Sequence, residues 1–65
     1  MERFVSVKFD TDYMGEKRIV RSLWGGWTPG TEVEVQATGP SGTPTWVKAR
    51  IERWVGQALM VSRLG

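Results

Sequence analysis

Residues that favour turns interrupt this chain so often that no long element fits between them. Glycine, proline and small polar residues cluster at 10–15, 24–31 and 38–44, and Gly56 follows the next apolar segment. The segments between these clusters are short, which is typical of strands in small all-β domains. The chain therefore has room for several short strands, and this spacing is the strongest constraint on its fold.

Alternation of apolar and polar residues predicts strands in these segments. Thr31–Ala37 alternates most cleanly, with valines on one face and Glu32, Glu34 and Gln36 on the other. Phe4–Phe9 also alternates, and Glu16–Trp24 is rich in β-branched and apolar residues. Ala58–Ser62 gives a last short strand. Pro29-Gly30 suits the two central positions of a type II turn, because proline presets φ at the first and glycine accepts a positive φ at the second.

The segment "WVKARIERWVG", Trp46–Gly56, can be read in two ways. In steps of two, apolar residues alternate with an outward face of Trp46, Lys48, Arg50, Glu52 and Trp54. In helical steps, Val47, Ile51 and Val55 form a stripe, with Thr43 and Gly56 as caps. A helix here has no polar face, and the neighbouring segments read as strands, so we favour a strand over Trp46–Ile51. The helix is kept as the alternative.

Five short strands in 65 residues predict an all-β fold, a five-stranded small barrel forming a single domain over residues 1–65. A two-layer sandwich requires about 100 residues. A closed barrel also removes the sheet edges, which a chain of this length has no other element to cover.

The run from Pro29 to Val61 resembles SH3-like barrels of the Tudor and related kinds. The resemblance covers about half the chain and lies in a glycine-led turn, a V-x-V strand, a W-x-x-A-x-I strand and a tight hairpin into a final strand. The matching residues are Gly30, Val33, Val35, Trp46, Ala49, Ile51, Gly56, Leu59 and Val61. The resemblance implies a five-stranded SH3-like small barrel. The Ala-Leu-Tyr-Asp-Tyr run of signalling SH3 domains is absent.

The residue types present argue against catalysis. The chain contains no His and no Cys, which excludes catalytic triads, cysteine nucleophiles and imidazole or thiolate metal sites. The run "DTDYMG" starts like a calcium loop, but Met14 and Arg21 stand where oxygen ligands are needed. We therefore predict no enzyme activity, no metal and no cofactor. No apolar run approaches the roughly 20 residues of a membrane span, and the expected location is the cytoplasm.

Charge and tryptophan content favour a binding function. The net charge is +2 and the sequence pI is near 9.5. Acidic residues gather at 10–16 and 32–36, where there is no cation, so we expect one basic side. Four tryptophans in so short a chain exceed what its small core requires, and this predicts an exposed apolar patch and a homodimer.

Aromatic residues interleaved with cations form the predicted binding face. Cations contact phosphates and aromatic rings stack on bases in single-stranded nucleic-acid sites, while tryptophan and arginine are also favoured at protein interfaces. The expected partner is therefore DNA or RNA, and the alternative is a protein-interaction module, inhibitor or adaptor that uses the same exposed tryptophans. The candidate residues are Arg21, Trp24, Trp27, Trp46, Lys48, Arg50, Arg53 and Trp54. For "WGGW", Trp24–Trp27, the other interpretation is that one tryptophan plugs the barrel mouth.

Overall fold

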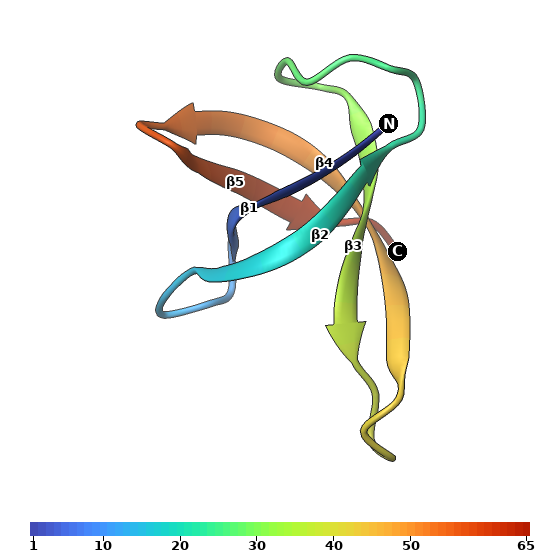
Figure 1. Cartoon of the computed structure of the whole chain (residues 1–65). Coiled ribbons are helices and arrows are strands. Elements are labelled where there is room, and N and C mark those ends of the chain that lie inside the picture. Colours follow the sequence, from blue (N-terminus) through green and yellow to red (C-terminus); the bar gives the residue numbers. More distant parts are fainter.

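The computed structural model describes residues 1–65 and contains five strands and no helix. All five predicted strands are present (Figure 1), and the helical alternative for Trp46–Gly56 is wrong because most of this segment lies in a strand. One predicted strand ends earlier than expected, so Leu23 and Trp24 belong to the loop that follows. The strands are β1 (Glu2–Phe9), β2 (Glu16–Ser22), β3 (Glu32–Thr38), β4 (Pro44–Val55) and β5 (Ala58–Arg63).

The five strands follow one another around a closed barrel in chain order (Figure 1). Neighbouring strands along the chain are antiparallel. A meander with an odd number of strands brings its first and last strands together in the same direction. β1 accordingly pairs with β5 in parallel, from Ser6 opposite Ala58 to Phe9 opposite Val61. The prediction of an all-β, five-stranded barrel is confirmed.

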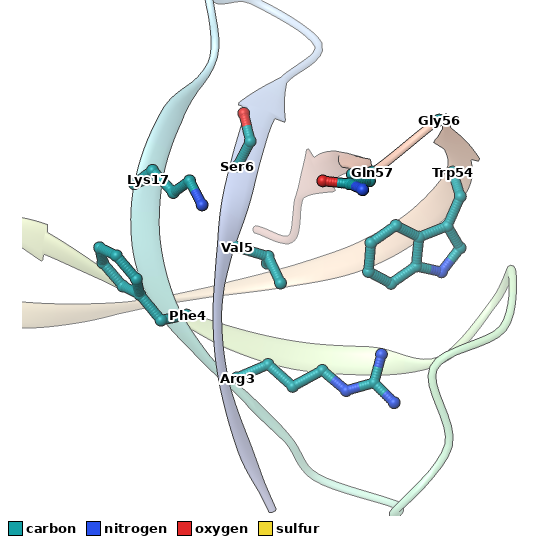
Figure 2. A pocket seen from close by; sticks show the side chains of 8 residues that line it. All are labelled: Arg3, Phe4, Val5, Ser6, Lys17, Trp54, Gly56 and Gln57. Carbon is teal, nitrogen blue, oxygen red and sulfur yellow. The ribbon is translucent and has the colours of Figure 1, made fainter.

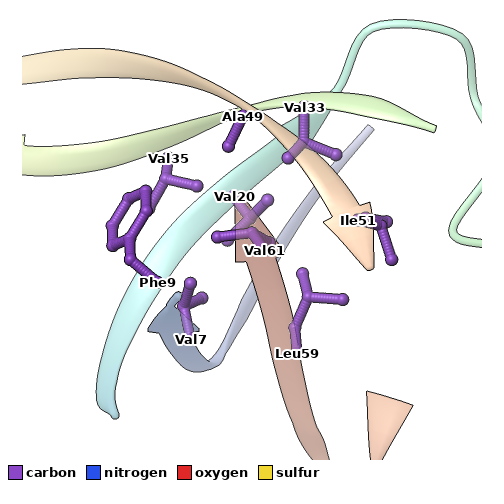
Figure 3. Close-up of a cluster of buried hydrophobic side chains, with 9 residues drawn as sticks. All are labelled: Val7, Phe9, Val20, Val33, Val35, Ala49, Ile51, Leu59 and Val61. Atoms are coloured by element: carbon purple, nitrogen blue, oxygen red, sulfur yellow. The ribbon is translucent and has the colours of Figure 1, made fainter. Parts of the chain in front are cut away.

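A single cluster of buried apolar side chains fills the barrel, and every strand contributes to it (Figure 3). Successive side chains of a strand point to opposite faces, so the apolar half of each alternating segment faces inward. Five of the nine members are valines, whose branched side chains pack well on a pleated surface. The members are Val7, Phe9, Val20, Val33, Val35, Ala49, Ile51, Leu59 and Val61.

A β-bulge in β4 changes the direction of the side chains that follow it. Ile51 lies opposite Val61 on β5, but Arg53 lies opposite Met60, so β4 has one extra residue at Glu52. Because side chains alternate with a period of two, one extra residue exchanges the inner and outer faces. Trp54 therefore packs against the core, whereas Val55 is 52% exposed.

Two glycine turns set the ends of β3 and β4. The amide of Thr31 donates to the carbonyl of Thr28 at 3.1 Å, and Gly30 has a φ of 92°. This is the geometry expected for Pro29-Gly30 in a type II turn. Gly56 has a φ of 58° and opens the two-residue connection between Val55 and Ala58. Glycine at this position matches a type II′ hairpin turn, whose twist suits the flanking strands.

Candidate ligand-binding cleft

The outward face predicted for β4 is divided by the bulge. Lys48 and Arg50 are exposed and alternate with the buried Ala49, as predicted. Trp54 does not share their face, because the extra residue at Glu52 turns it inward. The prediction that alternation carries Trp54 to the outer surface is wrong for this physical reason.

Trp54 and Trp27 instead pack at one end of the barrel. The indole Nε1 of Trp54 donates a hydrogen bond to the carbonyl oxygen of Trp27 at 2.7 Å, and both rings pack against the core. The guanidinium of Arg3 lies over the Trp27 ring, 4.7 Å from its centroid. The interpretation of one tryptophan in "WGGW" as a packing residue is therefore confirmed for Trp27, whereas Trp24 is 72% exposed.

Charges of opposite sign alternate across the outer surface of the first four strands. Arg21 on β2 lies opposite Glu2 on β1 and Glu34 on β3, and Glu34 lies opposite Lys48 on β4. In the next row Glu32 lies opposite Arg50. The carboxylates expected to be on a separate acidic region therefore lie beside the cations. Neighbouring charges of opposite sign reduce the potential that a phosphate chain would meet on this surface.

Arg21 and Trp46 form a stacked pair on the same surface. The guanidinium carbon of Arg21 lies 3.7 Å from the centre of the Trp46 ring. Carboxylate oxygens of Glu2 and Glu34 are each 3.8 Å from an Arg21 nitrogen. The two carboxylates partly offset the positive charge that Arg21 presents to a ligand, and Trp46 covers one face of its guanidinium.

A cleft of about 430 Å³ opens where β1 separates from β5 (Figure 2). β1 pairs with β2 from Glu2 onward, but its pairing with β5 begins only at Ser6. Glu2–Val5 therefore has a neighbouring strand on one side only. The cleft lies between this free edge and the β4–β5 hairpin, and Figure 2 shows Val5 and Trp54 on its two sides.

Two cations line this cleft and no carboxylate does. Arg3 and Lys17 form no ion pair. Phe4 is 64% exposed, and the Lys17 ammonium nitrogen lies 5.6 Å from the centre of its ring. Ser6 and Gln57 add neutral polar groups. The cleft therefore offers positive charge, hydrogen-bonding groups and an accessible ring to one ligand, which is a combination suited to an anion bearing a flat apolar group.

The remaining predicted residues lie apart from the cleft. Trp24 is on the exposed loop between β2 and β3. Arg53 follows the bulge and lines a smaller cleft of about 210 Å³ together with Lys8 and the acidic residues Asp10 and Glu52. Of the predicted residues, only Trp54 lines the cleft of Figure 2.

The sequence analysis missed Arg3, Phe4 and Lys17. One signal was available: Phe4 is a large apolar residue on the polar face of an alternating strand, where an aromatic ring is solvated unless it contacts a ligand or a partner. The position of Lys17 depends on the pairing register, in which it lies opposite Ser6. No sequence pattern fixes this register in advance.

The comparisons with known proteins identify no relative: no protein-family model, no curated protein and no solved structure matches the chain. No group of three or more His, Cys, Asp or Glu side chains is placed to hold a metal ion. The chain forms no helix long and apolar enough to cross a membrane. Assignment of a function therefore depends on the geometry of the cleft.

Proposed function

We propose that this chain is a non-catalytic binding protein for single-stranded nucleic acid and that the cleft beside β1 is its main contact. The observation that carries the proposal is the presence of Arg3 and Lys17 in a cleft without a carboxylate, next to the exposed ring of Phe4. A nucleotide supplies the matching groups, since its phosphate is an anion and its base is a flat ring. DNA and RNA share both groups.

Each of the three residues has a distinct role in this proposal. Lys17 is exposed and forms no ion pair, so its ammonium group contacts a phosphate. Phe4 stacks on a base, an interaction worth about 1–3 kcal/mol. The guanidinium of Arg3 lies over the Trp27 ring, and its N–H groups donate hydrogen bonds to the ligand in the cleft. Removing the unbalanced cations should weaken binding more than removing cations that already face carboxylates.

The cations predicted from sequence have a supporting role. Lys48 and Arg50 face Glu34 and Glu32 in the β3–β4 pairing, so an adjacent carboxylate offsets the attraction of each cation for a phosphate. Arg21 and Trp46 are stacked on each other. Trp24, which is exposed, remains a candidate for a separate contact.

We also propose that the barrel is of the SH3-like kind and acts in the cytoplasm. Support for the barrel type comes from the glycine turn before β3, the inward Val33 and Val35, and the tight hairpin at Gly56. These features match the resemblance found in the sequence.

The test compares two double variants with equal loss of charge. Arg3→Ala/Lys17→Ala should weaken binding of a labelled single-stranded oligonucleotide and lower its salt slope by about one unit for each lost phosphate contact. Lys48→Ala/Arg50→Ala should have a smaller effect. Fluorescence anisotropy at several salt concentrations measures both, and thermal melting of each variant controls for folding.

Two outcomes would contradict the proposal. The first is a wild-type protein that binds neither DNA nor RNA at low salt. The second is an equal loss of affinity in both double variants, because that result would assign binding to net charge rather than to the cleft.

A second candidate function is recognition of an extended peptide. It is favoured by the free edge of β1 at Glu2–Val5, because an unpaired strand edge can accept a further strand through main-chain hydrogen bonds. Such binding depends less on salt than phosphate contacts do. A ligand captured with little salt dependence, and displaced by no oligonucleotide, would favour this function over the first.

A further inference from the structure

A second cleft, of about 280 Å³, shares two residues with the first. Phe4 and Lys17 line both clefts. The first cleft lies toward the β4–β5 hairpin, and the second lies toward the β3–β4 hairpin, where Thr38 and Pro44 line it. Phe4 and Lys17 therefore lie between the two clefts, with one cleft on each side of them. Figure 2 shows Phe4 on the far side of β1 from Trp54.

The second cleft, like the first, opens where two neighbouring strands stop pairing. β2 pairs with β3 only over Val20–Ser22, so its first half separates from the end of β3. Across this gap, a guanidinium nitrogen of Arg18 donates to the carbonyl oxygen of Gln36 at 3.2 Å. Arg18 also pairs with Glu16 at 3.4 Å. The second cleft is therefore polar but less positive than the first.

From this arrangement we infer that the two clefts form one track for a single strand of several nucleotides that passes over Phe4 and Lys17. This inference rests on the proposed function. Two strands, β1 and β2, separate the clefts, and at about 4.8 Å between neighbouring strands this distance is on the order of 10 Å. One nucleotide has a single base and a single phosphate group to divide between the clefts, whereas a short oligonucleotide supplies a base and a phosphate to each.

The chemistry of the track favours an unpaired strand over a duplex. Phe4 is exposed between the two clefts, and stacking on it requires a base whose face is free. In a duplex, base faces are stacked on one another. Lys17 supplies a phosphate contact at the centre, and the neutral groups of Gln36 and Thr38 supply hydrogen bonds to a sugar or base in the second cleft.

The test uses oligonucleotides of increasing length and a charge placed in the second cleft. Thr38→Glu introduces an anion there, and Thr45→Glu introduces the same charge on the same hairpin outside both clefts. Wild type should bind a labelled hexanucleotide at least tenfold more tightly than a mononucleotide. Thr38→Glu should reduce hexanucleotide affinity several-fold more than Thr45→Glu does, and mononucleotide affinity should not distinguish the two variants.

Several results would contradict the proposal that the two clefts form one track. Equal affinity for the mononucleotide and the hexanucleotide would confine the ligand to the first cleft and leave the proposed function intact. Equal effects of the two substitutions would remove the second cleft from the site. Equally tight binding of a duplex, or displacement of the hexanucleotide by an equal concentration of hexaglutamate, would show that only charge is recognised. Absence of binding to any oligonucleotide would overturn the proposed function together with the track.

Discussion

Trp54 shows how one side chain can join a loop to the barrel. Its ring packs against the core, and its Nε1 holds the carbonyl of Trp27 at 2.7 Å. The loop between β2 and β3 is also bound to β4 at its far end, where the Gly30 amide donates to the Ile51 carbonyl at 2.8 Å, but near Trp27 its other tie is the local bond from the Ser22 hydroxyl to the Gly26 carbonyl at 2.7 Å. The position of Trp27, and with it the Arg3 guanidinium over its ring, therefore depends on Trp54.

A conservative change at Trp54 should measure this dependence. Trp54→Phe keeps an aromatic ring but removes the N–H donor, which leaves a part-buried carbonyl without its partner. We expect a loss of about 1–3 kcal/mol in the free energy of unfolding. Urea denaturation followed by circular dichroism measures it.

Trp24→Phe is the matched control for that experiment. Trp24 is 72% exposed, so this substitution should change the protein's free energy of unfolding by no more than about 0.5 kcal/mol. Equal losses in the two variants would mean that the Trp54–Trp27 hydrogen bond does not stabilise the fold.

At the scale of elements, the bulge in β4 decides which side chains the hairpin presents. Before the bulge Ile51 faces inward, and after it Trp54 does. If Glu52 paired regularly with Met60, Val55 rather than Trp54 would face the core. The bulge therefore places Trp54 both against the core and in the wall of the cleft.

Deletion of Glu52 should test this role directly. It removes the extra residue but leaves Arg53 opposite Met60 and Trp54 opposite Leu59, so alternation becomes regular and Trp54 stays inward. We expect cooperative unfolding to be retained, with no red shift of tryptophan emission. Deletion of Lys48, in the regular part of β4, is the comparison, because it exchanges the faces of the residues that follow and should abolish the cooperative transition. Equal damage from the two deletions would contradict the role of Glu52 as the extra residue.

The same element shows what the sequence could and could not predict. Alternation predicted the strands correctly, because burial of one face imposes a period of two on each segment. No sequence signal marks the bulge, because Glu52 and Arg53 are ordinary charged residues and no glycine lies next to them. The sequence also carries no pattern that sets the register between two strands. It therefore did not predict that Glu32 and Glu34 lie opposite Arg50 and Lys48.

For the whole molecule, exposed apolar side chains bear on the prediction of a dimer. Leu23 is 40% exposed and Trp24 is 72% exposed, and the carbonyl of Met1 accepts a hydrogen bond from the Ser22 amide at 3.0 Å. Met1 thus lies close to this pair of side chains. An apolar group of this kind on a small surface favours self-association.

Sedimentation at micromolar concentration should therefore reveal a dimer that Trp24→Glu disperses. The variant places a charge in the apolar group without touching the core. Phe4→Glu is the comparison, because Phe4 is also exposed but belongs to the cleft. A wild-type protein that sediments as a clean monomer would contradict the dimer.

The parallel contact between β1 and β5 also has a consequence for the order of events during synthesis. The ribosome makes β1 first, yet its closing partner β5 is the last of the five strands to emerge. Until then the sheet remains open at both ends, and open edges invite pairing with other chains. Ring closure joins residues as distant as Ser6 and Ala58, and contacts of such long range form slowly. The nascent chain is therefore most vulnerable to aggregation immediately before its last strand is released.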